Sequence, residues 1–224
     1  REITWEDYES LEGGVVGSLT KRANQLYEEL VQDDAYRHTV RNIMLRMISL
    51  QGNGLTRRQV PISELKYRDQ KENERVETVI KQFSKACLIV EGSNPPDEAY
   101  VEPAHDALVQ GWDKFQEWIK KDVEDLILQQ SLNVQVSDWK DKEKPETRLW
   151  GNDDRLPRLK QLLENQAKNW LNEQETDFVE QSIKQKRKQE DELTQNRINE
   201  LTPSANSRFR DHEQLEALTY ILKA

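Results

Sequence analysis

The chain has 224 residues, and 33 Lys and Arg against 42 Asp and Glu give it a formal net charge of −9. Only 8 Gly and 7 Pro are present, which favours long helices over a sandwich or barrel of many short strands. One Cys and three His exclude a disulfide framework and a zinc ligand set, and the acidic balance argues against general nucleic-acid binding.

No apolar run approaches the roughly 20 residues of a membrane span, and no signal-peptide pattern follows Arg1. We therefore expect a cytoplasmic protein that does not bind membranes. Because the chain opens on Arg1 rather than Met, we interpret it as a piece of a longer protein, with a trimmed end as the simpler alternative.

The first half of the chain predicts three helices and a hairpin. Apolar residues at steps of three and four predict amphipathic helices over residues 17–31, 34–50 and 72–86. The glycines of residues 51–54 are expected to end the second helix, and Pro61 excludes a central sheet position for the possible strand that follows. Extended runs around a turn-forming segment at 92–97 predict a β-hairpin. This order is typical of a winged helix.

The second half predicts further helices. A long helix over 105–122 carries a core-facing seam, with Trp118 off the seam as a candidate interdomain contact. More helices are expected over 123–139 and 155–165. Asn172 and Glu175 have capping-box spacing and open another helix, which the segment around Pro203 is expected to end before a last helix at 213–222.

Motifs for catalysis are missing. The sequence has no Gly-x-x-x-x-Gly-Lys-Ser/Thr loop, no Gly-x-Gly-x-x-Gly fingerprint, no Gly-x-Ser-x-Gly elbow and no His-Glu-x-x-His. We therefore expect no catalytic residue, no metal site and no cofactor bound by this chain alone.

A winged helix raises the possibility of DNA binding, and its recognition helix would be residues 72–86. That helix holds three basic and three acidic side chains, which leaves no net field for phosphates. We therefore favour a protein-interaction winged helix. The basic run at 184–188 is followed by Glu190, Asp191 and Glu192, and we interpret it as pairing at i,i+4 on an exposed helix.

His105 is expected to begin a helix directly after a strand. Helix N-termini favour anions, and an imidazole there can donate a hydrogen bond to one. Pro103 and Asp106 are also ordinary helix-start residues, so a capping role for His105 is the simpler alternative.

The segments 13–19, 57–65 and, most specifically, 101–112 carry a family resemblance. From about residue 5 to 190, the chain resembles the region that follows the nucleotide-binding module in STAND signalling NTPases, relatives of the NB-ARC (AP-ATPase) proteins. Its end, at 213–218, looks like the helix that precedes a WD-repeat propeller in such proteins.

The resemblance implies a role for His105 and Asp106. Ala104-His105-Asp106 is similar to the family's Met-His-Asp motif, whose His approaches the β-phosphate of ADP on the neighbouring ATPase domain and holds the off state. Ala replaces Met here, so only His105 and Asp106 carry over.

We therefore predict a mainly α protein in which a winged-helix domain, three helices plus a β-hairpin wing, is followed by a helical arm. Residues 1–16 are predicted to connect to an upstream ATPase domain, and residues 17–121 to form the winged helix. Residues 122–200 are predicted to form the arm, and residues 201–224 a linker with a short helix. The predicted function is non-catalytic regulation of a STAND ATPase, relaying signals from a WD-repeat sensor, with ADP or ATP bound only elsewhere in the parent protein.

Two alternatives stay open. The first is a winged-helix DNA-binding regulator with a helical dimerisation arm, which would use the basic side chains Arg57, Arg58, Lys81 and Lys85. The second is a purely helical scaffold with no switch.

Overall fold

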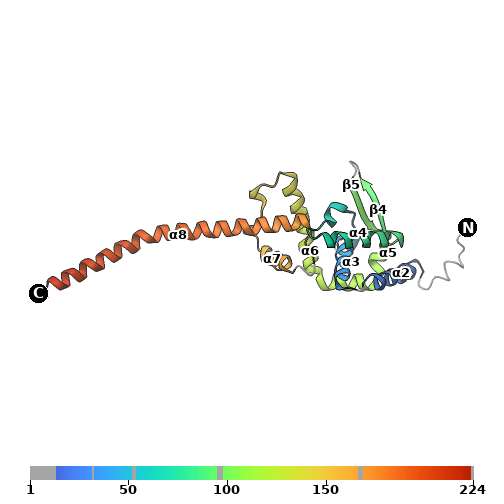
Figure 1. The fold of residues 1–224 in the computed structure, drawn as a ribbon, viewed down its shortest axis with the longest axis horizontal. Helices are drawn as coiled ribbons and strands as arrows, with labels where there is room; N and C mark the ends of the chain where they lie inside the picture. Colours follow the sequence, from blue (N-terminus) through green and yellow to red (C-terminus); the bar gives the residue numbers. More distant parts are fainter. Residues whose placement is uncertain (1–13, 32, 52–53, 95–97, 166–168, 223–224) are drawn as a thin grey trace, which may run out of the picture.

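The computed structural model describes residues 14–31, 33–51, 54–94, 98–165 and 169–222, and it is mainly helical with two small antiparallel sheets (Figure 1). The helices are α2 (Gly14–Leu30), α3 (Asp34–Arg46), α4 (Gln70–Lys85), α5 (Asp106–Gly111), α6 (Asp113–Asp141), α7 (Leu156–Glu164) and α8 (Glu173–Ile221), with short 3-10 turns η1 (Ile62–Leu65) and η2 (Glu146–Arg148). The strands are β1 (Ile48–Gln51), β2 (Gly54–Arg57), β3 (Val60–Pro61), β4 (Ile89–Asn94) and β5 (Glu98–Pro103). The predicted N-terminal connection, residues 1–16, lies mostly outside the described residues.

The larger sheet has the order β3-β5-β4, and all its pairs are antiparallel. Pro61 lies in β3 at the edge of this sheet, where the missing N–H of proline costs no ladder hydrogen bond. The helices α2, α3 and α4 and the hairpin β4–β5 therefore come in the predicted order. The assignment of this arrangement to the winged-helix fold stays a prediction.

The prediction that the second helix continues to Leu50 is wrong. Helix α3 ends at Arg46, and β1 pairs antiparallel with β2, with Ile48 opposite Arg57. The apolar residues from Ile43 to Ile48 fit a helical stripe and are all buried, and a short, fully buried apolar run does not distinguish helix from strand by its periodicity. The Asn53-Gly54 pair is a strong hairpin signal, although Gly52 and Asn53 lie outside the described residues.

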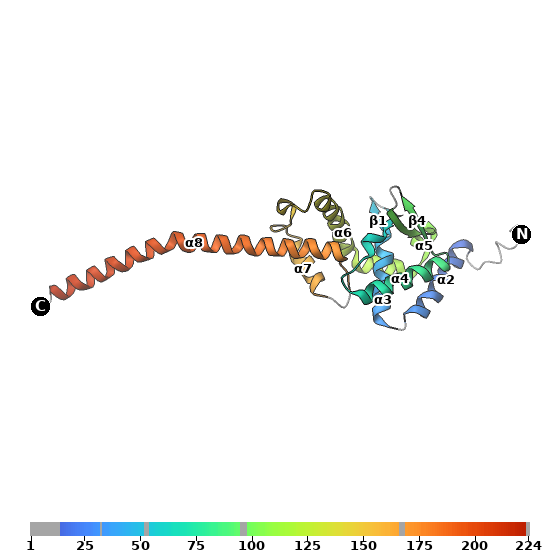
Figure 2. The same ribbon diagram turned by 45° about the horizontal axis from the view of Figure 1, so that its top comes forward.

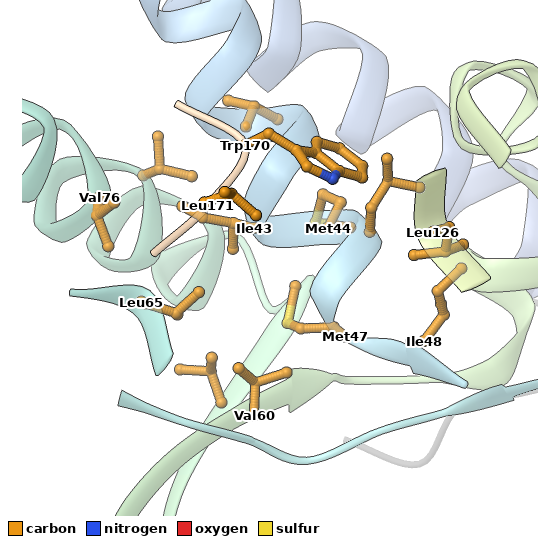
Figure 3. Packing of buried hydrophobic residues seen from close by; sticks show 14 of the residues in the cluster. Ile43, Met44, Met47, Ile48, Val60, Leu65, Val76, Leu126, Trp170 and Leu171 are labelled. Atoms are coloured by element: carbon orange, nitrogen blue, oxygen red, sulfur yellow. The ribbon is translucent and has the colours of Figure 1, made fainter. Parts of the chain in front are cut away.

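One continuous hydrophobic core joins the first helices to the later ones. Figure 3 shows Trp170 and Leu171, which precede α8, lying against Ile43 and Met44 of α3, with Leu126 of α6 nearby. Full burial of a side chain of this size contributes about 1.5–3 kcal/mol. The arm is therefore packed on the first helices through side chains that come from both halves of the chain.

The predicted helix over residues 105–122 is broken at Trp112, which has extended backbone angles between α5 and α6. The turn places the Trp112 ring among Tyr27, Phe115 and Trp118, and its Nε1 donates to Asn24 Oδ1 at 2.8 Å. The predicted seam residues are all buried, namely Leu108, Trp112, Phe115 and Ile119. Trp118 contacts Tyr27 of α2 and Trp112, so its expected interdomain contact is replaced by packing among the first helices.

Helix α6 continues through residues 121 and 122, where we expected a domain boundary. It joins the helix predicted to end at residue 122 to the helix predicted to begin at residue 123. Asp122 interrupts it with non-helical angles, φ −124° and ψ 25°, so the expected junction is a kink. The division into separate domains at this point stays a prediction.

Helix α8 is the longest element, at 49 residues, and it extends away from the rest of the molecule (Figures 1 and 2). The capping box is confirmed: Glu175 N donates to Asn172 Oδ1 at 2.8 Å, and Asn172 N donates to Glu175 Oε2 at 2.9 Å. The predicted break at Pro203 is wrong, because α8 passes through it. A proline removes one helical hydrogen bond, and on an exposed helix water hydrates the freed carbonyl, so a bend replaces a stop.

Candidate functional site

His105 forms the junction between β5 and α5. Its backbone is extended, with φ −151° and ψ 144°, and its Nδ1 accepts a hydrogen bond from Ala107 N at 2.9 Å. The capping role considered from the sequence is therefore present. A ring nitrogen that accepts must be unprotonated, so in this geometry the neutral imidazole carries its proton on Nε2. The side chain is exposed, and among the described residues nothing accepts a hydrogen bond from Nε2–H.

Asp106 follows at the first position of α5 and forms an ion pair with Arg57. The distance from Arg57 Nε to Asp106 Oδ1 is 2.7 Å, and Arg57 Nη1 also donates to Pro103 O at 3.1 Å. Both side chains are partly exposed, so solvent screening limits the pair to about 0–1 kcal/mol. Arg57 thus ties β2 to the turn that presents His105.

The sequence did not predict the link between Arg57 and Asp106: it pointed to Arg57 as part of the family-like segment 57–65 and as a DNA contact. The partner could not be found because residues 48–50 were predicted as helix, which hides the β1–β2 hairpin that places Arg57 there. The second basic residue of that pair, Arg58, donates to both oxygens of Glu64, at 2.9 and 2.6 Å. Two of the four cations considered for DNA are therefore held by carboxylates. Arg75 on α4 is held in the same way by Glu72.

The imidazole would have to provide most of any anion recognition at this site. Helix α5 has only six residues, and a helix this short contributes a small field at its N-terminus. Hollows of about 350 and 260 Å³ lie between the arm, with lining residues such as Leu162 and Trp139, and the segment around Arg68, and neither includes His105. In the part of the chain that the structure describes, no three His, Cys, Asp or Glu side chains gather as metal ligands.

The basic run of α8 does not pair as predicted. Among the described residues, no ion pair joins Lys184, Lys186, Arg187 or Lys188 to a carboxylate, although Glu190, Asp191 and Glu192 lie on the same helix. The i,i+4 interpretation is therefore wrong for this structure. None of the described helices is long and apolar enough to cross a membrane.

Comparison with known proteins identifies the family of this chain. No curated protein and no solved structure gives a match. Residues 1–147 match the family described as Novel STAND NTPase 1, and this stretch includes His105, Asp106 and Arg57. Because the match covers 147 of the 224 residues, the chain belongs to the Novel STAND NTPase 1 family.

Proposed function

We propose that this chain is a regulatory, non-catalytic region of a STAND-type signalling ATPase. The observation that carries the proposal is the family match over residues 1–147 in a sequence that has no phosphate-binding loop. A member of an NTPase family without that loop needs a nucleotide site supplied by another part of the parent protein. On this proposal the isolated chain hydrolyses no ATP.

Helices α2 to α4 and the hairpin β4–β5 would form a winged helix that docks on the ATPase domain. Docking on a protein rather than on DNA agrees with the charges on α4, where Arg75 is bound to Glu72 and leaves little positive field for DNA. The helices after Asp122 would form the arm, and the C-terminal end of α8 would lead toward a WD-repeat sensor. The docked and undocked positions would be two states whose populations nucleotide and signal both bias.

His105 would contact ADP in the docked state. Its Nδ1 is occupied by the backbone of Ala107, so the cap orients the ring and the exposed Nε2–H is the group that can donate to a phosphate oxygen. Asp106 would act indirectly, because its carboxylate is engaged by Arg57 and holds the start of α5 in place. Cytoplasmic location belongs to the same proposal.

The test separates the two roles of His105 with matched variants of the parent protein. His105→Asn retains a side-chain acceptor for the Ala107 N–H, whereas His105→Ala removes both cap and imidazole. The proposal predicts faster ADP release and higher basal activity in both variants. If His105→Asn retains ADP like the wild type, His105 is a cap only and the assigned phosphate contact is refuted.

A further inference from the structure

A buried ion pair joins α3 to the first turn of α8. Arg46 Nη1 donates to Glu175 Oε1 at 2.9 Å, and Arg46 Nη2 donates to Glu175 Oε2 at 2.6 Å. The side chains are 2% and 0% exposed. Burial alone would lower the pKa of Arg46, but the charge and hydrogen bonds of Glu175 raise that pKa above its ordinary value. The two side chains form a bidentate guanidinium–carboxylate pair inside the protein.

The same face of α3 also holds the segment that leads into α8. Arg46 Nη2 donates to Trp170 O at 3.0 Å, and Asn42 Nδ2 donates to Asn169 O at 3.0 Å. Next to Asn42, the guanidinium of Arg41 lies 4.7 Å from the centre of the Trp170 ring. Three side chains of a single helix therefore bind residues 169–175.

Polar contacts from other elements complete the attachment. Asn172 Nδ2 donates to Glu64 O at 3.0 Å, and Glu173 N donates to Lys66 O at 2.8 Å. From α6, Gln129 Nε2 donates to Trp170 O at 3.2 Å. The base of α8 is thus held by hydrogen bonds and charges together with apolar anchors, which are Trp170 and Leu171 (Figure 3) and the fully buried Phe178 and Val179.

The polar cluster is not fully satisfied. Arg46 Nε and the Tyr67 hydroxyl are both buried and have no hydrogen-bond partner among the described residues. A buried ion pair roughly balances its Coulomb attraction against the loss of hydration, and an unsatisfied buried polar atom adds cost. When residues 169–175 move away from α3, water can hydrate the side chains of Arg46 and Glu175 again. The ion pair itself therefore contributes only a small net free energy to the closed arrangement.

We propose that Arg46 and Glu175 form a latch, which sets the direction of α8 on the first helices and opens as a unit while those helices stay folded. Because a helix rises about 1.5 Å per residue, α8 spans roughly 70 Å, and a tilt of about 10° at its base moves its tip by about 13 Å. Opening the latch would thus convert a local change at α3 into a large movement. The inference goes beyond the proposed function and needs no nucleotide.

Native-state hydrogen exchange on the wild-type chain tests the latch without a substitution. The amide of Glu173, which donates to Lys66 O rather than within α8, should show protection at least about tenfold lower than that of α4 core amides such as Val79, and a weaker dependence on urea. If this amide exchanges only through global unfolding, the latch does not open separately and the proposal fails.

Distance measurements between spin labels test the direction of α8. Labels at Lys81→Cys on α4 and Lys188→Cys on α8 use exposed positions. Cys87 is exposed and has φ 54°, so Cys87→Gly removes it without strain. We expect a narrow distance distribution in this background. Glu175→Gln, which retains the capping box but leaves the Arg46 charge unpaired, should broaden it at least about twofold.

Two further variants complete the design. Glu180→Gln, on the same helix as Glu175, breaks an exposed pair with Arg68 and should leave the distribution narrow. Arg46→Met combined with Glu175→Gln removes the unpaired buried charge and should restore the narrow distribution. An unchanged distribution in Glu175→Gln overturns the proposal. So does loss of the near-ultraviolet circular dichroism of the Trp112 cluster in that variant, because the pair would then hold the core rather than the arm.

Discussion

Arg46 and Glu175 lie 129 residues apart in the sequence and form a bidentate ion pair inside the protein, with Arg46 Nη2 2.6 Å from Glu175 Oε2. The pair connects α3, which contributes to the hydrophobic core, to α8, which extends away from the rest of the molecule. The consequences for stability differ for the loss of one partner and the loss of both, because only the first leaves a charge buried and unpaired.

Replacing one partner should therefore destabilise the protein more than replacing both. We expect Glu175→Gln to lower the free energy of unfolding by up to about 3–5 kcal/mol, and Arg46→Met with Glu175→Gln to recover most of this loss. Glu180→Gln, at an exposed ion pair, should change it by less than about 1 kcal/mol. Urea unfolding measures all three. Equal or additive losses in the single and double variants would contradict the account.

The phenol of Tyr67 should give the protein an alkaline limit. Burial raises the pKa of Tyr67 above its ordinary value of 10.0, and the nearby Arg46 charge only partly opposes this. The neutral phenol is favoured in the folded state, so its contribution is intact below pH 10 and is lost as the pH rises through the folded pKa. Each such group changes the free energy of unfolding by at most about 1.4 kcal/mol per pH unit.

Tyr67→Phe isolates this effect. At neutral pH it should cost little, since the hydroxyl has no hydrogen-bond partner among the described residues. Between pH 9 and 11.5 it should lose stability less steeply than the wild type. Burial also raises the pKa of Tyr27, so the free energy of unfolding of Tyr67→Phe should still depend partly on pH in this range. Urea unfolding across that range measures the slope, with Tyr36→Phe on α3 as the control. Identical slopes in Tyr67→Phe and wild type would refute the assignment.

Gly111 lets α2 approach the junction between α5 and α6. A Cβ atom added there would overlap Cγ1 of Val16, and Thr20 of α2 also donates to Gly111 O at 3.4 Å. We expect Gly111→Ala to destabilise the protein by about 1–3 kcal/mol. Adding Val16→Ala should relieve the overlap and recover part of that loss. Thermal unfolding of the two single variants and the double variant measures the coupling, which should vanish if α2 does not pack there.

The cap at His105 should have its own effect on stability. His105→Ala removes the acceptor for the Ala107 N–H and should cost about 1 kcal/mol, whereas His105→Asn should remain within a few tenths of the wild type. Urea unfolding of the isolated chain measures both. A loss in His105→Asn as large as that in His105→Ala would show that the ring itself, rather than its acceptor, supports the fold.

Local signals predicted much of the fold. The start of α8 was predicted because Asn172 is followed three residues later by Glu175, the spacing of a capping box. The two hydrogen bonds of that capping box are confirmed. The edge position of Pro61 followed from its missing N–H and is also confirmed. These features depend on a few neighbouring residues, so one sequence contains the information they need.

Features that depend on distant partners were not predictable. The apolar residues from Ile43 to Ile48 are all buried, so the change from helix to strand there depends on pairing with β2. Nothing near Arg46 in the sequence points to Glu175, because the pair forms only when α3 and α8 meet. At the candidate site, the position of His105 at a helix start was predicted, while the ion pair of Asp106 with Arg57 required the unpredicted hairpin.

The central claim is that this region holds a STAND-type ATPase in its ADP-bound state through His105, and ADP release from the parent protein tests it most directly. Dissociation of pre-bound ADP should be measured in wild type, His105→Asn and His105→Ala under identical conditions. The account predicts faster release from both variants, by about tenfold if one charge-assisted hydrogen bond is lost. Release from His105→Asn at the wild-type rate would contradict it.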